Sequence, residues 1–393
     1  MRKRVVIKFG GADLSTGEKI AQAAQMVKDA PYEEKLVVVS AMGKMTESLI
    51  GAISKLGNVC DADYAEIVSM GERTSARILS CALRAIGENS EVIDPTSGNW
   101  PIITDSDFRD AKPEIEETKT SVKQNLEPML ASSVPVVCGF LGKDTAGKIT
   151  TLGRGGSDTT AMLLAYCLQA DEIVLVKDTS GILSADPKVV SNARFLNTID
   201  IQEAFDLMQG GAKIIKPEAL KYKLPSQKLR IVSFDSGNLT VGGTEIQGSF
   251  NMSSTEIEIQ LDLLAVNMVC EVNANNLKEA FQALQDRPVY GVSSGKKSIT
   301  IFTSDGKVNE TINKLHSVTA FKAISFRENV AMIQVTHPIF VDSPGGVAKI
   351  STALSQQDIN IIETTTSKAT INVFIEANQL RKAKEAISHV FET

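Results

Sequence analysis

The stretch Thr150–Thr160 reads TTLGRGGSDTT and determines how the surrounding chain must fold. It places Arg154 among glycines and then enters a helical pattern over Ser157–Ala170, with apolar residues three and four apart on one face. Continuous apolar runs flank it at Pro135–Leu141 and Glu172–Lys177, as in strands that are buried on both faces. The stretch is therefore predicted to be a strand-to-helix turn at the edge of a buried sheet.

The same alternation of apolar strands and amphipathic helices fills the first half of the chain. Further buried strands are predicted at Val5–Phe9, Leu36–Ser40 and Glu91–Asp94. One amphipathic helix is predicted near residues 20–27 and another over Asp63–Ile86. This order predicts an α/β fold with an open, mostly parallel sheet sandwiched by helices. Ligands of such folds bind at the carboxyl ends of the strands, where the glycine-rich turns of this chain fall.

The composition is that of a globular protein with two or three domains. The 393 residues are 43% hydrophobic and 22% charged, and the formal net charge is −6. This charge gives no general attraction to nucleic acid or acidic membranes, and no run approaches the ~18 apolar residues of a membrane-spanning helix. Val5–Ile7 is too short for the core of a signal peptide, and Lys8 interrupts it. We therefore expect a cytoplasmic protein with no nucleic-acid or membrane partner.

Cysteine and histidine are sparse and scattered. The five cysteines form no CxxC pair, which disfavours a zinc site and predicts buried, reduced thiols. The three histidines all lie in the last quarter of the chain, away from the glycine-rich turns. The chemistry is therefore expected to use Lys, Arg, Asp, Glu, Ser and backbone N–H groups, a set that suits the transfer of a phosphoryl group.

A change of composition at Leu239–Ser254 predicts a domain boundary. This stretch is rich in Gly, Thr, Ser and Asn, and the chain beyond it reads β-α-β-β-α twice, at an offset of about 72 residues. We predict a first domain over residues 1–250 and two α+β, ferredoxin-like modules at 255–325 and 326–393. Small duplicated modules suit ligand sensing or dimerisation better than a second catalytic centre.

Two glycine-rich turns contain residues that fit an anion. Lys8–Gly11 (KFGG) ends the first strand, where the glycines let backbone N–H groups approach a phosphate and Lys8 adds positive charge. An ordinary turn with an exposed lysine is the alternative. Arg154, enclosed by three glycines, can grip a carboxylate or phosphate with both arms of its guanidinium. Asp158 opens a helix whose N-terminal N–H groups form an anion site, although acidic residues are also common there as simple helix charges.

Other candidates are ambiguous in isolation. Gly142–Lys148 fits a P-loop pattern, but Ile149 stands where Ser or Thr must hold Mg²⁺, so a hairpin between two short strands is predicted. Glu72 lies in a predicted helix, either as a solvated or ion-paired carboxylate or as the acceptor of a substrate ammonium group. Lys177–Lys188 follows a strand at a position suited to a nucleotide, but it also suits a plain loop. Lys213, near a helix end, is equally ambiguous.

Taken in order, these segments resemble the aspartate kinases of the amino acid kinase family. The resemblance spans essentially the whole chain, with a kinase domain to about residue 250 and then two regulatory modules of the ACT type. Thr150–Asp158 is its most specific block, since it separates aspartate kinases from relatives that act on acetylglutamate, UMP or carbamate. The other matching blocks are Lys8–Gly11, Ser69–Arg73, Gly139–Gly142, Ala185–Lys188 and Gly211–Lys213.

The resemblance implies ATP-dependent phosphorylation of the β-carboxylate of L-aspartate, which opens the route to lysine, threonine and methionine. Lys8 and Asp158 are the implied catalytic residues, and Mg²⁺ is expected to enter with ATP near Asp158 rather than on a site made by side chains alone. Arg154 is expected to bind the α-carboxylate of aspartate and Glu72 its α-ammonium group, with Thr46 and Ser157 adding hydrogen bonds. The implied nucleotide-binding residues are Lys8, Gly10, Gly11, Lys177, Asp178, Lys188 and Lys213.

Four positions depart from the family pattern. Ala12 stands where Thr is frequent, Ser180 replaces an acidic residue, Leu183 replaces a nucleotide-side Tyr, and Lys216 replaces a His. None of them is one of the four charged residues expected at the reacting centre. The departures therefore bear on nucleotide binding rather than on the reaction itself.

The second module contains a turn that implies regulation. Val341–Ile350 resembles the ACT turn that exposes backbone N–H groups to an effector amino acid, here expected to be lysine or threonine. The corresponding turn of the first module, Val272–Asn276, lacks Pro-Gly, so we expect it to be mainly a packing partner, or only one module to bind effector. ACT pairs assemble across subunits, which predicts a homodimer or homotetramer. The implied effector-binding residues are Ser343, Pro344, Gly345, Gly346 and Val347.

Two other functions remain open on sequence. In the first, a chain with the same fold acts on another acidic small molecule, which predicts faster turnover with that acceptor than with aspartate. A catalytically silent, kinase-like amino-acid sensor would keep the ACT pair, and the nucleotide-side departures are the reason to consider it.

Overall fold

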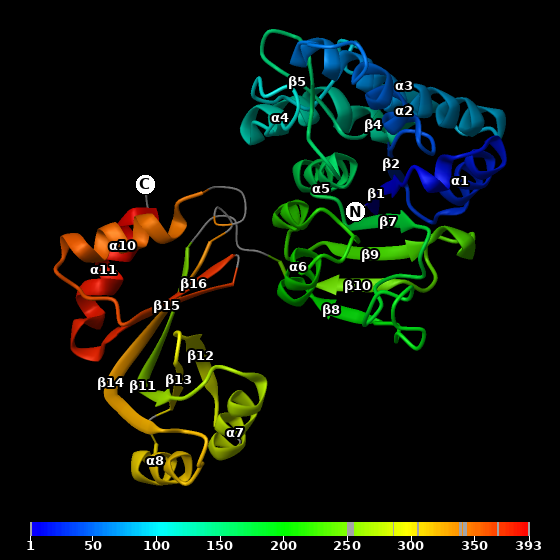
Figure 1. The fold of residues 1–393 in the computed structure, drawn as a ribbon. Helices are drawn as coiled ribbons and strands as arrows, with labels where there is room; N and C mark the ends of the chain where they lie inside the picture. The colour runs from blue at the N-terminus through cyan, green and yellow to red at the C-terminus, as the bar shows by residue number, and fades with distance from the viewer. Residues whose placement is uncertain are drawn as a thin grey trace. The chain divides into compact units, whose positions relative to one another are not determined.

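The computed structural model describes residues 2–249, 255–285, 287–304, 306–337, 340, 344–367 and 369–391. The chain divides into two compact units, Met1–Phe250 and Asn251–Thr393. Each unit is built on its own β-sheet with helices packed against it (Figure 1). The two units are described separately.

In its described residues, unit 1 contains an eight-stranded sheet in the order β3-β4-β2-β1-β7-β9-β10-β8. The first six strands of this order are parallel, β10 is antiparallel to β9, and β8 is parallel to β10. The predicted open, mostly parallel sheet is therefore confirmed. The strands are β1 Arg4–Phe9, β2 Glu34–Val39, β3 Ser90–Ile93, β4 Val134–Cys138, β7 Glu172–Lys177, β8 Thr198–Asp200, β9 Lys228–Ser233 and β10 Thr244–Gln247.

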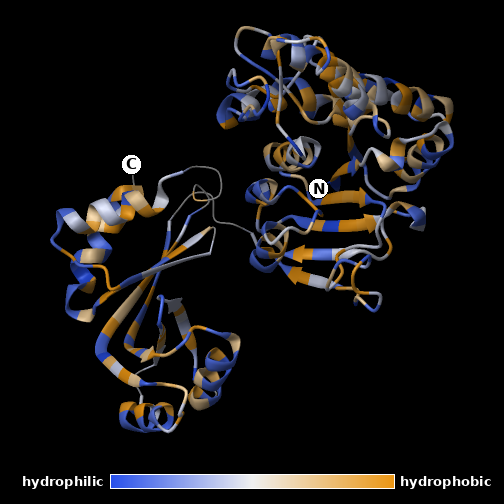
Figure 2. Ribbon diagram, in the orientation of Figure 1, coloured by the Kyte–Doolittle hydropathy of each residue, from blue (hydrophilic) through white to orange (hydrophobic). Residues whose placement is uncertain are grey.

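The core of unit 1 lies around the central strand β1. Val5, Val6 and Ile7 have no exposed surface, because β1 pairs with β2 on one side and β7 on the other and helices cover the sheet. Helices α5 and α1 lie on opposite sides of this strand (Figure 1). Figure 2 shows hydrophobic and hydrophilic residues side by side on the helices, as expected where one face of each is buried. The helices are α1 Gly17–Asp29, α2 Met45–Ile53, α3 Asp61–Ala85, α4 Ile115–Ser121, α5 Gly156–Leu168 and α6 Ile201–Gln209.

Short strands and helical turns complete unit 1. β5 (Leu141–Lys143) pairs antiparallel with β6 (Ile149–Thr151), which confirms the predicted hairpin in place of a P-loop. Strand β9 was not predicted. Strands β8 and β10, beyond it in the sheet, were not predicted either, and β10 falls inside the stretch expected to be a boundary. Both alternate buried and exposed residues over only three or four positions, too few to register as a strand pattern. The short helical turns of unit 1 are Ala12–Leu14, Val122–Leu126, Glu127–Ala131, Pro217–Tyr222 and Phe234–Ser236.

Unit 2 confirms the duplicated β-α-β-β-α order. Its described residues form a six-stranded sheet in the order β12-β13-β11-β14-β16-β15. The first copy comprises β11 Glu256–Val269, α7 Ala274–Leu284, β12 Val289–Ser294, β13 Ser298–Ser304 and α8 Val308–His316. The second comprises β14 Ala323–Thr336, α10 Gly346–Gln356, β15 Glu363–Ser367, β16 Thr370–Glu376 and α11 Leu380–Phe391, with a short turn at Ala377–Gln379.

The two copies share strands. The first residues of β11, Glu256–Gln260, pair with the end of β14, whereas Leu263–Val269 pair with β13 and with the beginning of β14. Both 14-residue strands therefore run through both copies, and the expected division at 325/326 falls inside β14. Separate cores lie beneath the two helix pairs, one with Leu264 and Ile301 and the other with Ile333 and Leu354.

The described residues contain no helix long and apolar enough to cross a membrane. All five cysteines are free thiols, as expected, but the expectation that they are buried is wrong for some of them. Cys138 and Cys270 are buried, whereas Cys60 and Cys81 are exposed because they lie at the start and on the outer face of α3.

Candidate functional site

Three charged side chains from three elements meet at the carboxyl edge of the sheet in unit 1. Lys8 is in β1, Lys177 ends the neighbouring strand β7, and Asp158 lies in the first turn of α5. Lys8 Nζ is 2.6 Å from Asp158 Oδ1, and Lys177 Nζ is 3.0 Å from Asp158 Oδ2. Lys8 and Asp158 are each only 5% exposed. We call these three residues the charged centre.

The two lysines of the charged centre stabilise the ionised form of Asp158. Burial alone would raise the pKa of Asp158, but the two lysines outweigh it and lower that pKa to about 2. Burial lowers the pKa of Lys8, and its ion pair with Asp158 opposes this change. A carboxylate between two ammonium groups fixes their positions, so that they present a local excess of positive charge to an incoming anion.

The arginine turn, Gly153–Gly155, precedes α5. Gly153 and Gly155 have φ of 68° and 77°, a left-handed backbone that glycine adopts without strain. Arg154 is exposed and has no hydrogen bond or ion pair with the described residues. Lys216, which departs from His, lies against this turn; its Nζ donates to Leu152 O at 3.2 Å and lies 3.9 Å from Asp110 Oδ1, so its charge is partly balanced by Asp110. The turn therefore has positive charge available for an anionic ligand.

Glu72 projects from α3 toward the loop that follows β2. Ala41 N–H donates to Glu72 Oε1 at 3.1 Å, and Glu72 Oε2 has no hydrogen-bond partner among the described residues although the side chain is 3% exposed. Burial raises the pKa of Glu72 to about 7. Gly71 permits this close approach, since a Cβ there would lie 2.7 Å from Ala41 Cβ and 3.4 Å from Thr46 Oγ1. Thr46, in α2, therefore lies close to α3 at Gly71, the residue before Glu72.

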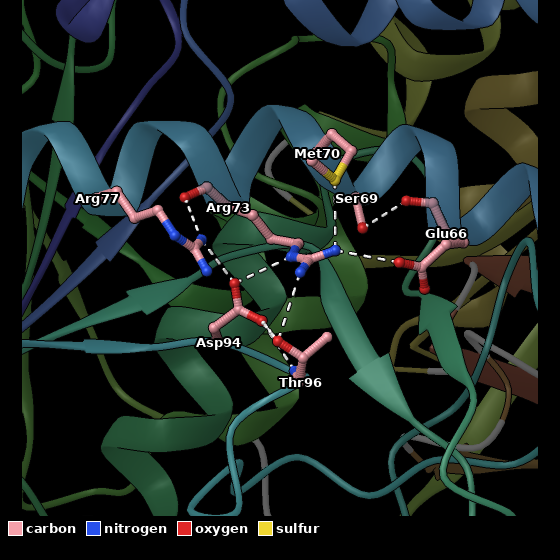
Figure 3. Close-up of polar contacts among 7 residues, drawn as sticks. All are labelled: Glu66, Ser69, Met70, Arg73, Arg77, Asp94 and Thr96. Carbon is pink, nitrogen blue, oxygen red and sulfur yellow. Dashed lines mark hydrogen bonds and ion pairs between the residues drawn. The ribbon is translucent and has the colours of Figure 1, made fainter.

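An ionic clamp holds α3 against the end of β3 (Figure 3). Asp94 Oδ2 accepts from Arg73 Nε at 2.9 Å and from Arg77 Nη1 at 2.7 Å. Asp94 Oδ1 accepts from Thr96 N–H and Oγ1–H. Burial would raise the pKa of Asp94, but the Thr96 and arginine hydrogen bonds lower it to about 2. Because Arg73 follows Glu72, the clamp fixes the part of α3 that presents Glu72.

The remaining site candidates differ in how firmly they are held. Ser157 is 8% exposed and packs against Gly139, at the end of β4. Asp178 is exposed directly after Lys177. Lys188 and Lys213 are also exposed, in the loop after β7 and after α6, and neither side chain has a described partner. The charged centre, Glu72 and Thr46 are thus held by packing, whereas Arg154 and the two loop lysines are not.

Three residues of unit 1 depart from the family pattern: Ala12, which begins a short helical turn, and Ser180 and Leu183, which lie in the loop after β7. Ala12 and Ser180 are exposed, and Leu183 forms an isolated bridge with Phe195. None of the three contacts the charged centre through a hydrogen bond or ion pair in the described residues.

The expected effector turn lies partly within the described residues. Ser343 falls outside them. Pro344 and Gly345 form a turn with φ of 96° at Gly345, and Gly346 opens α10. Val347 is 42% exposed in the first turn of that helix.

The sequence analysis missed two acidic residues of this region. Asp13 is 2% exposed and its Oδ2 accepts from Gly10 N–H at 3.0 Å, although it looks in sequence like an ordinary loop residue. Asp94, of the clamp, could have been suspected because it is the last residue of the predicted strand Glu91–Asp94, at the carboxyl end where ligand-binding residues gather. Its arginine partners are 17 and 21 residues away in the sequence, and only the fold brings them close.

The arrangement suits transfer of a phosphoryl group to a carboxylate. Fixed cations and free backbone N–H groups can bind phosphates, and a free guanidinium and a buried carboxylate can bind the two charged groups of an amino acid. Within the described residues no three His, Cys, Asp or Glu side chains are grouped as a metal site. Both oxygens of Asp158 already bind lysines.

Comparison with known proteins agrees with this geometry. The model of the amino acid kinase family matches residues 3–233, and that of an ACT domain matches residues 325–389. The chain is 31% identical to an aspartokinase from Pseudomonas aeruginosa, over 99% of this chain and 97% of that protein. The structure of an aspartate kinase from Synechocystis covers 99% of this chain, with 70% of its own length matched, 25% identity and a TM-score of 0.76.

A second solved structure shares the fold. Escherichia coli aspartokinase III in complex with aspartate and ADP matches 99% of both chains, with 21% identity and a TM-score of 0.58. The matches to the family model and to the Pseudomonas relative cover the charged centre, the arginine turn and the regulatory unit in one colinear chain. The chain therefore belongs to the amino acid kinase family, among the aspartokinases that carry a C-terminal ACT domain.

Proposed function

We propose that this chain transfers the γ-phosphoryl group of ATP to the β-carboxylate of L-aspartate and forms 4-phospho-L-aspartate. The observation that carries the proposal is the buried Lys8–Asp158–Lys177 centre, which lies beside the glycine-arginine block in a chain related over its whole length to aspartokinases. A β-carboxylate oxygen attacks the γ-phosphorus, the bond from that phosphorus to the bridging oxygen breaks, and ADP leaves.

The charges of the site match the needs of this reaction. Both reactants are anionic, so the barrier falls when fixed cations neutralise the phosphates and hold attack in line. Lys8 contacts the transferring group, and Asp158 keeps Lys8 and Lys177 in place. The attacking carboxylate is already ionised near pH 7, so no general base is needed. This accounts for a site that lacks histidine among its candidate residues.

Aspartate is bound by charge at both ends. Arg154 takes the α-carboxylate, since its guanidinium is exposed and has no described partner. Glu72 takes the α-ammonium group, since its Oε2 is buried without a hydrogen bond. Thr46 and Ser157 add hydrogen bonds from α2 and α5. Another acidic acceptor without an α-amino group would leave Glu72 uncompensated, which favours aspartate.

The nucleotide lies along the loops that follow β7 and α6. Its ligands are Lys8, Gly11 and Lys177 at the phosphates, with Asp178, Lys188 and Lys213 toward the rest of the nucleotide. Gly10 was predicted with them, but its N–H already donates to Asp13 Oδ2, so it shapes the turn instead of contacting a phosphate. Mg²⁺ bound with ATP supplies further neutralisation of the β- and γ-phosphates.

The experiment that tests the proposal is an acyl-phosphate assay. The purified chain, incubated with Mg·ATP, aspartate and hydroxylamine, should form a hydroxamate at a rate that depends on aspartate. Glutamate, N-acetylglutamate and carbamate serve as alternative acceptors. Faster turnover with one of these would overturn aspartate as the substrate, and no product with any acceptor would indicate a catalytically silent sensor.

We also propose feedback regulation through unit 2. The turn Pro344–Gly346 would present backbone N–H groups to the carboxylate of lysine or threonine, and a homodimer or homotetramer would form through the ACT modules. Regulation requires different affinity of the effector for active and inactive states. Millimolar lysine or threonine should lower the rate of hydroxamate formation, and a rate unchanged by both would contradict this part of the proposal.

A further inference from the structure

Asp13 closes the turn that follows β1. Its Oδ2 accepts a hydrogen bond from Gly10 N–H at 3.0 Å, and its own N–H donates to Gly10 O at 3.1 Å. The side chain is 2% exposed. The side chain and the backbone of one residue therefore hold both polar groups of Gly10, and the turn cannot open without breaking both hydrogen bonds.

The same turn is also fixed from its other side. Gly11 O accepts from Leu14 N–H at 3.3 Å and from Gly43 N–H at 2.9 Å. Gly11 N–H, in contrast, has no acceptor among the described residues. Asp13 thus uses the first amide of the glycine pair and leaves the second one available to a ligand.

The carboxylate of Asp13 lies in the electrostatic environment of the charged centre. Burial raises its pKa, and the hydrogen bond from Gly10 and the charges of Lys8 and Lys177 oppose this change, while Asp178 adds to it. A surface turn could be closed equally well by an exposed Asn or Ser, without the cost of a buried carboxylate. A buried acid beside a site for polyanionic phosphates points to a role in that site.

We propose that Asp13 is a positioning residue for phosphoryl transfer, which holds Gly10 N–H so that Gly11 N–H is the amide of the turn that donates to a phosphate oxygen. The proposal rests on the phosphotransfer function above and adds to it a residue outside the family blocks. Asp13 touches neither substrate, since it acts through the turn.

Three substitutions separate the hydrogen bond from the charge. Asp13→Asn keeps an oxygen that accepts from Gly10 N–H and removes the negative charge. Asp13→Ala removes both, and Asp13→Glu keeps the charge but displaces the acceptor by one methylene. We expect Asp13→Ala and Asp13→Glu to lower kcat about tenfold and to raise the KM for ATP several-fold, with the KM for aspartate within about twofold of wild type. Asp13→Asn should restore kcat to within about threefold of wild type.

The control is Thr16→Ala, which removes another side-chain acceptor of a backbone N–H in the same segment, that of Lys19 at 3.4 Å. It should lower the melting temperature without changing either KM. Binding of Mg·ADP to each full-length variant is measured by calorimetry, so that the role of Asp13 is tested even if aspartate proves not to be the acceptor. If Asp13→Ala does not fold, Asp13→Glu is the test variant.

Two outcomes would overturn the proposal. In one, Asp13→Ala and Asp13→Glu retain wild-type kcat and wild-type affinity for Mg·ADP. In the other, Asp13→Asn is as impaired as Asp13→Ala, which would make the charge rather than the hydrogen bond essential.

Discussion

The two ends of the candidate site are prepared in opposite ways. At the phosphate end, Lys8 and Lys177 are already paired with Asp158, and its pKa is held at about 2. At the acceptor end, Arg154 has no described partner and Glu72 keeps one oxygen unsatisfied, with its pKa raised to about 7. The first end is complete before the nucleotide binds, whereas the second is completed by the substrate. Substitutions should therefore affect kcat at one end and KM at the other.

The largest expected effect is at Lys8. Lys8→Met keeps the apolar stem but removes the cation nearest the transferring group, and kcat should fall about 10²–10³-fold with little change in the KM for aspartate. Steady-state kinetics by the hydroxamate assay would measure this. Lys35→Met is the matched control, since Lys35 begins the neighbouring strand β2 and its Nζ donates to carbonyls at the end of α1. If Lys8→Met lost only affinity for aspartate, the proposed difference between the phosphate end and the acceptor end would be wrong.

Arg154 should show the opposite behaviour. Arg154→Ala removes the bidentate partner of the α-carboxylate, so the KM for aspartate should rise about 30–100-fold while kcat falls less. Arg154→Lys keeps the positive charge but loses the two-armed guanidinium, so its KM for aspartate should lie between those of the wild type and Arg154→Ala. An increase confined to the KM for ATP would instead assign the arginine turn to the nucleotide.

Glu72 sharpens the comparison through pH. Glu72→Gln should raise the KM for aspartate about tenfold. In the wild type, kcat/KM for aspartate should rise with pH through about 7, as Glu72 ionises in the free protein, and this rise should be absent in Glu72→Gln. Asp63→Asn, an exposed acid on the same helix, should leave the profile unchanged. A wild-type profile flat between pH 6 and 8 would remove Glu72 from the acceptor site.

The same glutamate should also affect stability. Its folded pKa of about 7 is above the ordinary value of 4.5, so the native state binds the proton more tightly than the unfolded state. Stability contributed by the protonated form is therefore lost as pH rises from about 4.5 to about 7, by a total of about 3 kcal/mol. Urea unfolding at several pH values should show this loss in the wild type and not in Glu72→Gln.

The smallest expected effect is at the exposed nucleotide loop. Lys213→Ala should raise the KM for ATP only about threefold, because an exposed lysine interacts through solvent. A fall in kcat as large as that expected for Lys8→Met would show that the part of the phosphate end completed before the nucleotide binds extends beyond the charged centre.

The sequence predicts which charged residues gather at this edge of the sheet, but it does not predict all the contacts between them. Lys8 and Asp158 are 150 positions apart, yet their predicted places at a strand end and a helix start were enough to bring them to one edge. The pairing of Lys177 with Asp158, in contrast, depends on the register of β7 against β1, which the apolar pattern of either strand does not specify. Asp13 was missed because nothing in its local sequence shows that it is buried, and the role of Asp94 was missed because its arginine partners are distant in the sequence. The edge strands β8 and β10 were missed because their patterns are too short.

The continuity of β11 and β14 has a mechanical consequence for the regulatory unit. The pairing of the two strands is irregular only between Gln260 and Ala265, where the register shifts, so a twist of one repeat reaches the other through this short stretch of both strands. Cutting the chain at residue 325 would remove material from each repeat and leave neither with its full set of strands. Unit 2 should consequently melt in a single step, and an effector held by one repeat must stiffen the whole of it.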